Sequence, residues 1–198
     1  MNYPLLHTLT FDVLYACACI LIFVIFERTF YLSYLAVRSA RIAREIARSP
    51  AVGAAPAMPD RKSRDPITQA VGRYLDVASR TGVTRGQLED YSAALYIEVD
   101  KKISARLWIL DTIITAAPLL GLLGTIFGIM QTFTALSQGG VSDPAEVSRG
   151  IGLALTATAI GIAVALVGLV GHNVLNRRAQ LLTESFKLFV LRLTPAAP

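Results

Sequence analysis

Three long apolar stretches constrain the fold of this chain more than any other feature of its sequence. They run over residues 13–35, 108–136 and 151–175, and each exceeds the roughly 20 residues that a helix needs to cross the apolar core of a bilayer. Of the 198 residues, 54% are hydrophobic and 17% are charged, which is too apolar for an ordinary soluble domain. The sequence therefore predicts an all-α membrane protein with three transmembrane helices.

Basic residues indicate the orientation, because Lys and Arg prefer the cytoplasmic side of a membrane. They are abundant in residues 36–107 and 176–198, whereas residues 1–12 and 137–150 contain only Arg149. We therefore expect a periplasmic N-terminus and loop, and a cytoplasmic middle segment and C-terminus. The net charge of +5 follows from these cytoplasmic segments, where acidic residues are interspersed and no base-reading motif occurs, so nucleic acid is not an expected partner.

Helical patterning continues on the cytoplasmic side. The first helix is expected to extend through LAVRSARIAREIARS, and the Pro-, Ala- and Gly-rich residues 49–66 are typical of a mobile linker. Thr84 and Gln87 form a potential capping box before apolar residues at helical spacing. We expect one unbroken helix from Gln87 to Leu136, about 75 Å long. The tail 176–193 should pack against these cytoplasmic helices through its apolar series, Leu181, Leu182, Phe186, Phe189, Val190 and Leu193.

Small residues recur every three or four positions in the second and third stretches. In a membrane such residues let helix backbones approach closely, so they predict helix-packing faces and an oligomer. The residues are Gly121, Gly124 and Gly128 in the second stretch, and Gly150, Ala154, Ala157, Gly161 and Gly168 in the third.

Three threonines, Thr125, Thr156 and Thr158, lie near mid-membrane beside these small residues. Each hydroxyl could simply bond the carbonyl one turn back, which is a purely structural role. Together they could instead line a polar pore, although Thr156 and Thr158 point about 200° apart around a helix. The apolar centres contain no Asp, Glu or His, so a titrating carboxylate for proton transport would have to come from another protein.

Motifs for enzymes, metals and cofactors are weak. GLLGTIFG lacks the lysine of a phosphate-binding loop, and no serine and histidine share the membrane centres as an intramembrane hydrolase would require. Cys17 and Cys19 point to different sides of a helix and have no companion metal ligands. We therefore expect no enzymatic activity, no metal and no cofactor.

The segment APLLGLLGTIFGIMQTF, followed after a short loop by GIGLALTATAIGIAVAL, resembles the proton-channel family of ExbB, TolQ and the flagellar stator protein MotA. Three spans rather than four favour the ExbB and TolQ branch. The resemblance implies a homopentamer in the bacterial inner membrane, surrounding two helices of an ExbD- or TolR-type single-span partner. That partner supplies the membrane Asp. The resemblance further implies that the complex lies in the phospholipid membrane, and that proton flow through it energises TonB-dependent outer-membrane transport or a TolA-type protein.

By this resemblance, Thr125 and Thr158 match the pore threonines of the family, and Thr156 adds a further hydroxyl. Leu153 stands where the ExbB and TolQ pattern usually has Glu, and Val167 where a proline often follows. Three alternatives remain open: a TolQ-like motor for envelope maintenance, a motor driven by sodium, and a structural scaffold that conducts nothing.

Overall fold

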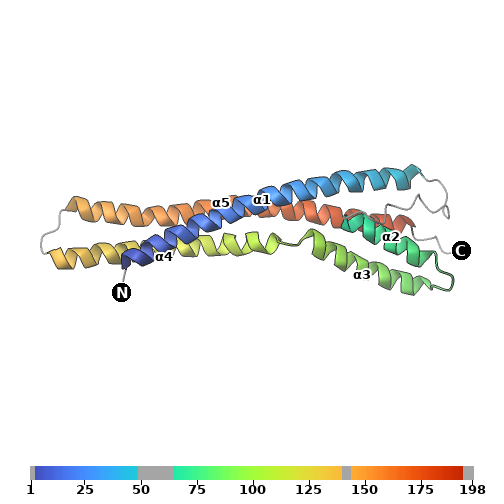
Figure 1. Ribbon diagram of the computed structural model, residues 1–198, viewed down its shortest axis with the longest axis horizontal. Coiled ribbons are helices and arrows are strands. Elements are labelled where there is room, and N and C mark those ends of the chain that lie inside the picture. The colour runs from blue at the N-terminus through green and yellow to red at the C-terminus, as the bar shows by residue number, and fades with distance from the viewer. Residues whose placement is uncertain (1–2, 49–64, 140–143, 194–198) are drawn as a thin grey trace. The chain divides into compact units, whose positions relative to one another are not determined.

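The computed structural model describes residues 3–48, 65–139 and 144–193, and the regular structure in these ranges is entirely helical (Figure 1). Most of the predicted linker 49–66 lies outside the described residues, and its last residue, Pro66, already begins a helix. The helices are α1 (Tyr3–Arg48), α2 (Pro66–Ala78), α3 (Arg85–Ile103), α4 (Leu107–Gly139) and α5 (Pro144–Leu193).

Three of these helices are long and apolar enough to cross a membrane. They are Leu5–Arg41 in α1, Leu107–Ser137 in α4 and Pro144–Leu191 in α5. Each contains one of the predicted stretches, so the prediction of three long apolar helices is confirmed. Large apolar side chains on them face away from the rest of the chain, as Phe23 and Phe26 do at 67% and 66% exposure. Lipid is the environment in which such exposure is stable.

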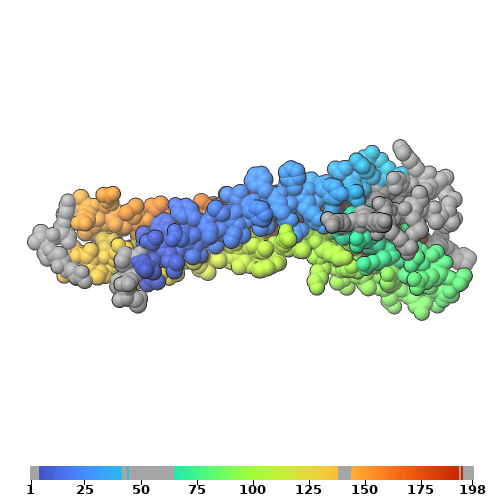
Figure 2. Space-filling model, in the orientation of Figure 1, coloured from blue at the N-terminus to red at the C-terminus, as the bar shows by residue number. Residues whose placement is uncertain are grey.

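The chain divides into two compact units. The first comprises Met1–Glu27 and Arg106–Asn173, and the second comprises Arg28–Ala105 and Val174–Pro198. In the first unit, the beginning of α1 lies against α4 and α5 (Figure 2). Contacts that join α1 to the other two helices include those of Thr10 with Gly124, Leu21 with Gly168 and Ile25 with Gly171.

The second unit is built from α2, α3 and the extensions of α1 and α5. Asp65 caps α2 by accepting the Ile67 amide at 3.1 Å, and Pro66 fits the first helical position because it has no amide hydrogen to leave unpaired. The predicted capping box of α3 is confirmed: the Thr84 hydroxyl accepts the Gln87 amide, and the Gln87 side chain accepts the Thr84 amide.

An apolar core fills the second unit, and α5 contributes one face to it. The expected packing of the tail is confirmed for four residues of its apolar series, whereas Leu181 is 46% exposed. The Thr183 hydroxyl, on the same buried face, donates to Asp100 of α3 at 3.3 Å. The buried members of this core include Ile67, Val71 and Tyr74 of α2, Leu95 and Val99 of α3, and Leu182, Phe186, Phe189 and Val190 of α5.

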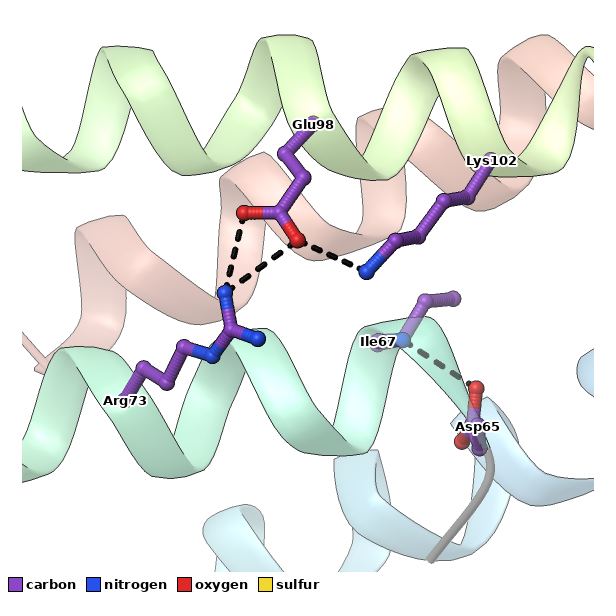
Figure 3. A network of polar contacts seen from close by, with 5 residues as sticks. All are labelled: Asp65, Ile67, Arg73, Glu98 and Lys102. Carbon is purple, nitrogen blue, oxygen red and sulfur yellow. Dashed lines mark hydrogen bonds and ion pairs between the residues drawn. The ribbon is translucent and has the colours of Figure 1, made fainter.

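A charged network joins α2 to α3 (Figure 3). The Glu98 carboxylate accepts from Lys102 at 2.7 Å and from Arg73 at 3.0 and 3.1 Å. The hydrogen bond from Lys102 is the main reason that the pKa of Glu98 is lowered; burial opposes this, and the charges of Lys102 and Arg73 add to it. Since Glu98 is 41% exposed, solvent screening keeps its contribution to stability small.

Acidification is expected to loosen the contact between α2 and α3. A carboxyl with a lowered folded pKa contributes stability above its unfolded pKa of about 4.3, and that stability is lost as the pH falls through the folded value. The protection factors of the α2 amides, which are hydrogen-exchange rates corrected for the intrinsic pH dependence, should therefore fall between about pH 6 and pH 3. The variant Glu98→Gln should lose this fall in protection, and an unchanged profile in the variant would contradict the assignment.

The prediction of one unbroken helix from Gln87 to Leu136 is wrong, because α3 ends at Ile103 and α4 begins at Leu107. The Ser104 amide still bonds the Asp100 carbonyl at 2.8 Å, which closes the last turn of α3.

The break is completed by Arg106, whose φ of 69° lies in the left-handed region. For a residue with a side chain this conformation costs about 1–2 kcal/mol. The Arg106 guanidinium donates to the Glu27 carboxylate of α1 at 3.1 Å, a contact that favours this conformation. Periodicity could not reveal the break, because buried apolar residues continue at three- and four-residue steps across it, at Val99, Ile103, Leu107 and Leu110.

Candidate functional site

The contact between α4 and α5 is a seam of small residues in the first unit. A Cβ atom added at Gly161 would lie 2.5 Å from the Ala117 carbonyl oxygen, and one added at Gly121 would lie 2.7 Å from the Ala157 carbonyl oxygen. Real Cβ atoms do not approach so closely, and a backbone carbonyl cannot turn aside as a flexible side chain can. The two backbones therefore approach here as closely as only glycine permits.

The seam continues over the neighbouring turns toward the beginning of α5. An added Cβ would lie 2.9 Å from the Ala157 methyl group at Gly124, and 2.7 Å from the Ala154 methyl group at Gly128. Gly150 faces Thr132 of α4, whereas Gly168 faces Leu21 of α1 and Ile114 of α4. The structure thus places the predicted small residues in contacts between α1, α4 and α5.

Thr125 lies inside this seam and is only 8% exposed. Its hydroxyl oxygen is 2.5 Å from the hydroxyl oxygen of Thr158, 3.0 Å from the Ala154 carbonyl oxygen and 3.2 Å from the Gly121 carbonyl oxygen. The Thr158 hydroxyl in turn lies 3.1 Å from the Gly121 carbonyl oxygen. Two threonines that are 33 positions apart in the sequence therefore form one hydrogen-bonded pair, which we call the hydroxyl pair.

The bonding of the hydroxyl pair crosses from one helix to the other. Gly121 lies one turn before Thr125 on α4, and Ala154 lies one turn before Thr158 on α5, yet each of these carbonyls is within reach of the threonine on the other helix. Each hydroxyl has one hydrogen to donate. The pair thus offers two hydrogens to two carbonyls and to each other, so every donor is satisfied without water.

Thr156 is not part of the pair. It is exposed on α5, and its hydroxyl donates to the Gly152 carbonyl one turn back at 2.9 Å. Other threonines of α4 bond within their own helix in the same way, as Thr134 does to Met130 at 2.7 Å. The structure therefore brings together two of the three predicted pore residues and separates the third.

The electrostatics around the hydroxyl pair are those of neutral dipoles. The sequence has no acidic or basic residue from Thr112 to Gly139 or from Gly150 to Gly171. Among the described residues, no three His, Cys, Asp or Glu side chains come together as metal ligands. A threonine hydroxyl can donate or accept a hydrogen bond, but it does not hold a proton as an imidazole or a carboxylate does. The pair can solvate a titrating group that approaches it.

Sequence reasoning missed a group of polar residues at one end of the same unit. His7, Gln131, Thr132 and Glu146 line a common cavity between α1, α4 and α5. His7 lies more than a hundred positions from the other three along the chain, which hides the group, since no local motif connects α1 to α4 and α5. The Glu27–Arg106 ion pair, formed between residues 79 positions apart, was missed for the same reason.

Comparison with known proteins gives consistent matches. A model described as the MotA/TolQ/ExbB proton channel family matches residues 63–187. The chain is similar to the biopolymer transport protein ExbB of Aquifex aeolicus, with 34% identity over 116 residues, which cover 58% of this chain and 73% of that protein. It is also similar to the biopolymer transport protein ExbB of Helicobacter pylori, with 41% identity over 86 residues, covering 43% of this chain and 59% of that protein.

A third relative carries a different name. The Tol-Pal system protein TolQ of Haemophilus influenzae is 31% identical over 108 residues, which cover 54% of this chain and 47% of that protein. The chain thus spans about half the length of this relative. In all of these proteins the matched part is shorter than the whole.

Proposed function

Because this chain belongs to the MotA/TolQ/ExbB proton channel family, we propose that it is the ExbB-like subunit of an inner-membrane proton-driven motor. In this proposal it acts with an ExbD- or TolR-type single-span partner, and the proton motive force is used to energise TonB-dependent transport at the outer membrane. Five copies surround two partner helices, residues 1–12 and 137–150 face the periplasm, and residues 36–107 and 176–198 lie in the cytoplasm.

The observation that carries the proposal is the hydroxyl pair. It places two hydroxyls from different helices together in a seam built mainly from glycine and apolar residues, where they both hold α4 against α5 and can solvate a titrating group. The centres of α4 and α5 contain no group that could hold a proton. The proton-bearing carboxylate is therefore assigned to the partner, and Thr125 and Thr158 to its solvation.

Two alternative motors are considered: one drives a different process at the cell envelope, and the other uses a different ion. A TolQ-like role in envelope maintenance is supported by the TolQ relative, whereas the ExbB relatives support the transport role. A sodium-driven motor is disfavoured by the geometry of the pair. The two hydroxyls already bond each other and the carbonyl oxygens of Ala154 and Gly121, so an ion held by these four oxygens would have to replace these bonds. Thr156 is exposed on a different face of α5 from the hydroxyl pair. We propose that it lines the pore separately from the pair.

A scaffold that conducts nothing is the third alternative, and assembly together with flux tests it. Native mass spectrometry of the chain, purified first alone and then with a single-span protein of the same genome that carries a membrane aspartate, should show a pentamer that captures two partner chains. The complex in liposomes should acidify the lumen when a membrane potential is applied. A monomer or dimer that captures no such partner would favour the scaffold.

A further inference from the structure

Exposed apolar side chains continue along α5 for a greater length than a bilayer can cover. They extend from Leu153 to Leu191, which are 57% and 61% exposed. The 38 positions between them correspond to about 57 Å of helix. A bilayer is about 40–45 Å thick including its headgroups. In the orientation proposed above the excess lies on the cytoplasmic side, so the apolar residues at the end of α5 need a protein surface to cover them.

Within the second unit these residues form one stripe along α5. Val174, Leu181 and Leu188 are spaced by seven positions, which is nearly two turns of helix. Two charged residues lie on the same side, each three positions after an apolar one. At 3.6 residues per turn, this side is opposite the buried Ala179 and Phe186. The α5 stripe comprises the exposed residues Val174, Arg177, Leu181, Glu184, Leu188 and Leu191.

A second stripe lies on the part of α1 that belongs to the same unit. Its members follow one another at alternating steps of four and three positions, so they share one side of the helix. That side is opposite the buried Leu35 and Ser39. Phe30 is 80% exposed, which is unusual for an aromatic ring next to a charged segment. The α1 stripe comprises the exposed residues Phe30, Tyr34, Val37, Arg41 and Arg44.

The two stripes lie at the same level along their helices. The Arg178 guanidinium donates to the Ser33 hydroxyl at 3.5 Å, so residues of α5 lie beside residues of α1 that are 145 positions earlier. The contact of Ile25 with Gly171 has nearly the same offset, which shows that α1 and α5 run in parallel. Each stripe points away from the core that the two helices share, so the stripes face in different directions.

The residues of the two stripes are complementary at each level. With this offset Leu181 lies within one position of the level of Val37, and Glu184 lies two positions from the level of Arg41. Arg177 falls between the levels of the Phe30 and Tyr34 rings, where a guanidinium is attracted by an aromatic face. Rotation about an axis along the membrane normal keeps every residue at its own level. The α5 stripe of one copy can therefore meet the α1 stripe of the next copy in register.

We propose that the α1 stripe of each copy packs on the α5 stripe of its neighbour and so closes the cytoplasmic part of the ring. Val37 packs on the neighbour's Leu181, and Arg41 pairs with the neighbour's Glu184. Two unlike faces on one chain make a head-to-tail contact, which is the kind that generates a closed ring of more than two copies. This contact rests on the proposed function, since it assumes that the motor is a ring of this chain.

The first test is a disulfide between neighbours in native membranes. In a Cys17→Ala/Cys19→Ala background, Val37→Cys together with Leu181→Cys should form on oxidation a ladder of covalent species up to the size of the whole ring. Either cysteine alone should remain monomeric, because like residues do not meet in a head-to-tail contact. The control pairs Val37→Cys with Gln180→Cys, which is exposed at almost the same level but about 100° further around α5, and it should give no ladder.

The second test exchanges the charges of the proposed ion pair. Glu184→Arg and Arg41→Glu should each raise the concentration at which the detergent-solubilised ring dissociates in native mass spectrometry by about tenfold, because like charges then meet. The double variant restores an opposite pair and should return this concentration to that of the wild type. Both residues are exposed in the single chain, so the helix content measured by circular dichroism should not change. Weakening that the double variant does not reverse would contradict the pairing.

These outcomes separate the contact from the proposed function. A disulfide that forms only within one chain, or single-cysteine variants that form dimers, would overturn the head-to-tail contact. A ring that assembles and carries protons but forms no disulfide between Val37→Cys and Leu181→Cys would overturn the contact alone. A wild-type chain that remains monomeric in membranes would overturn the contact and the proposed function together.

Discussion

Replacing Thr125 with valine is expected to reduce proton flux through the assembled complex by at least about tenfold, which corresponds to about 1.4 kcal/mol of barrier. Valine keeps the shape of threonine but has no hydroxyl to offer to a titrating group. The helices should still pack, because the Thr158 hydroxyl keeps the Gly121 carbonyl as its acceptor at 3.1 Å. The loss of one net hydrogen bond should lower the free energy of unfolding by only about 1 kcal/mol.

The measurement is flux in liposomes alongside native mass spectrometry of the same preparation. Thr125→Ser keeps the hydroxyl and should keep most of the flux. Thr134→Val is the matched control, since it removes a hydroxyl of α4 that bonds only within its own helix, to Met130. Flux at the wild-type level in Thr125→Val, with complexes that assemble normally, would remove the basis of the proposed function.

The second large effect is expected at Gly161. An alanine methyl group there would lie 2.5 Å from the Ala117 carbonyl oxygen and 3.2 Å from Cα of Gly121, so α4 and α5 must separate as whole helices. Overpacking of this kind costs about 1–3 kcal/mol, and the upper end is expected because the obstacle is backbone. Separation of the helices also pulls Thr125 away from Thr158, so Gly161→Ala should lose flux as well as thermal stability.

Gly152 provides the control for this substitution on the same helix. Nothing lies within 4 Å of a Cβ atom added there, so Gly152→Ala meets open space. Alanine has the better helix propensity by about 1 kcal/mol, and this variant should unfold at the same temperature as the wild type or slightly above it. Equal melting temperatures for Gly161→Ala and Gly152→Ala in detergent would show that the seam is looser than the contacts at Gly161 indicate.

Features that depend on composition or on neighbouring residues could be predicted from the sequence. The apolar helices are examples, because length and hydropathy are properties of a continuous segment. The capping box is another, because Thr84 and Gln87 are three positions apart and their bonds need no tertiary contact. Periodicity nevertheless gave a wrong prediction at Arg106. Apolar residues keep their three- and four-residue spacing across the turn between α3 and α4, so the pattern did not indicate the break in the helix.

Features that depend on contacts between helices could not be predicted in the same way. The resemblance to a family singled out Thr125 and Thr158 as separate residues, but their cross-bonding to the carbonyls of Ala154 and Gly121 depends on the register of α4 against α5. A shift of one turn would leave each hydroxyl bonded to its own helix, as Thr156 is. The cavity around His7 is formed by three helices together, and no residue spacing in the sequence predicts a contact among three helices.

The cross-bonding of the two threonines gives the seam a polarity that can be reversed. In one arrangement Thr158 donates to Thr125, which donates to the Ala154 carbonyl; in the other Thr125 donates to Thr158, which donates to the Gly121 carbonyl. Only two C–O bond rotations separate the arrangements, and such side-chain motions take picoseconds to nanoseconds, whereas helices move in microseconds to milliseconds. The glycine contacts hold the backbone still meanwhile. The hydroxyl pair can therefore reverse its dipole while α4 and α5 stay in place. A neighbouring group that alternates between a charged and a neutral form would meet a matching dipole in each form.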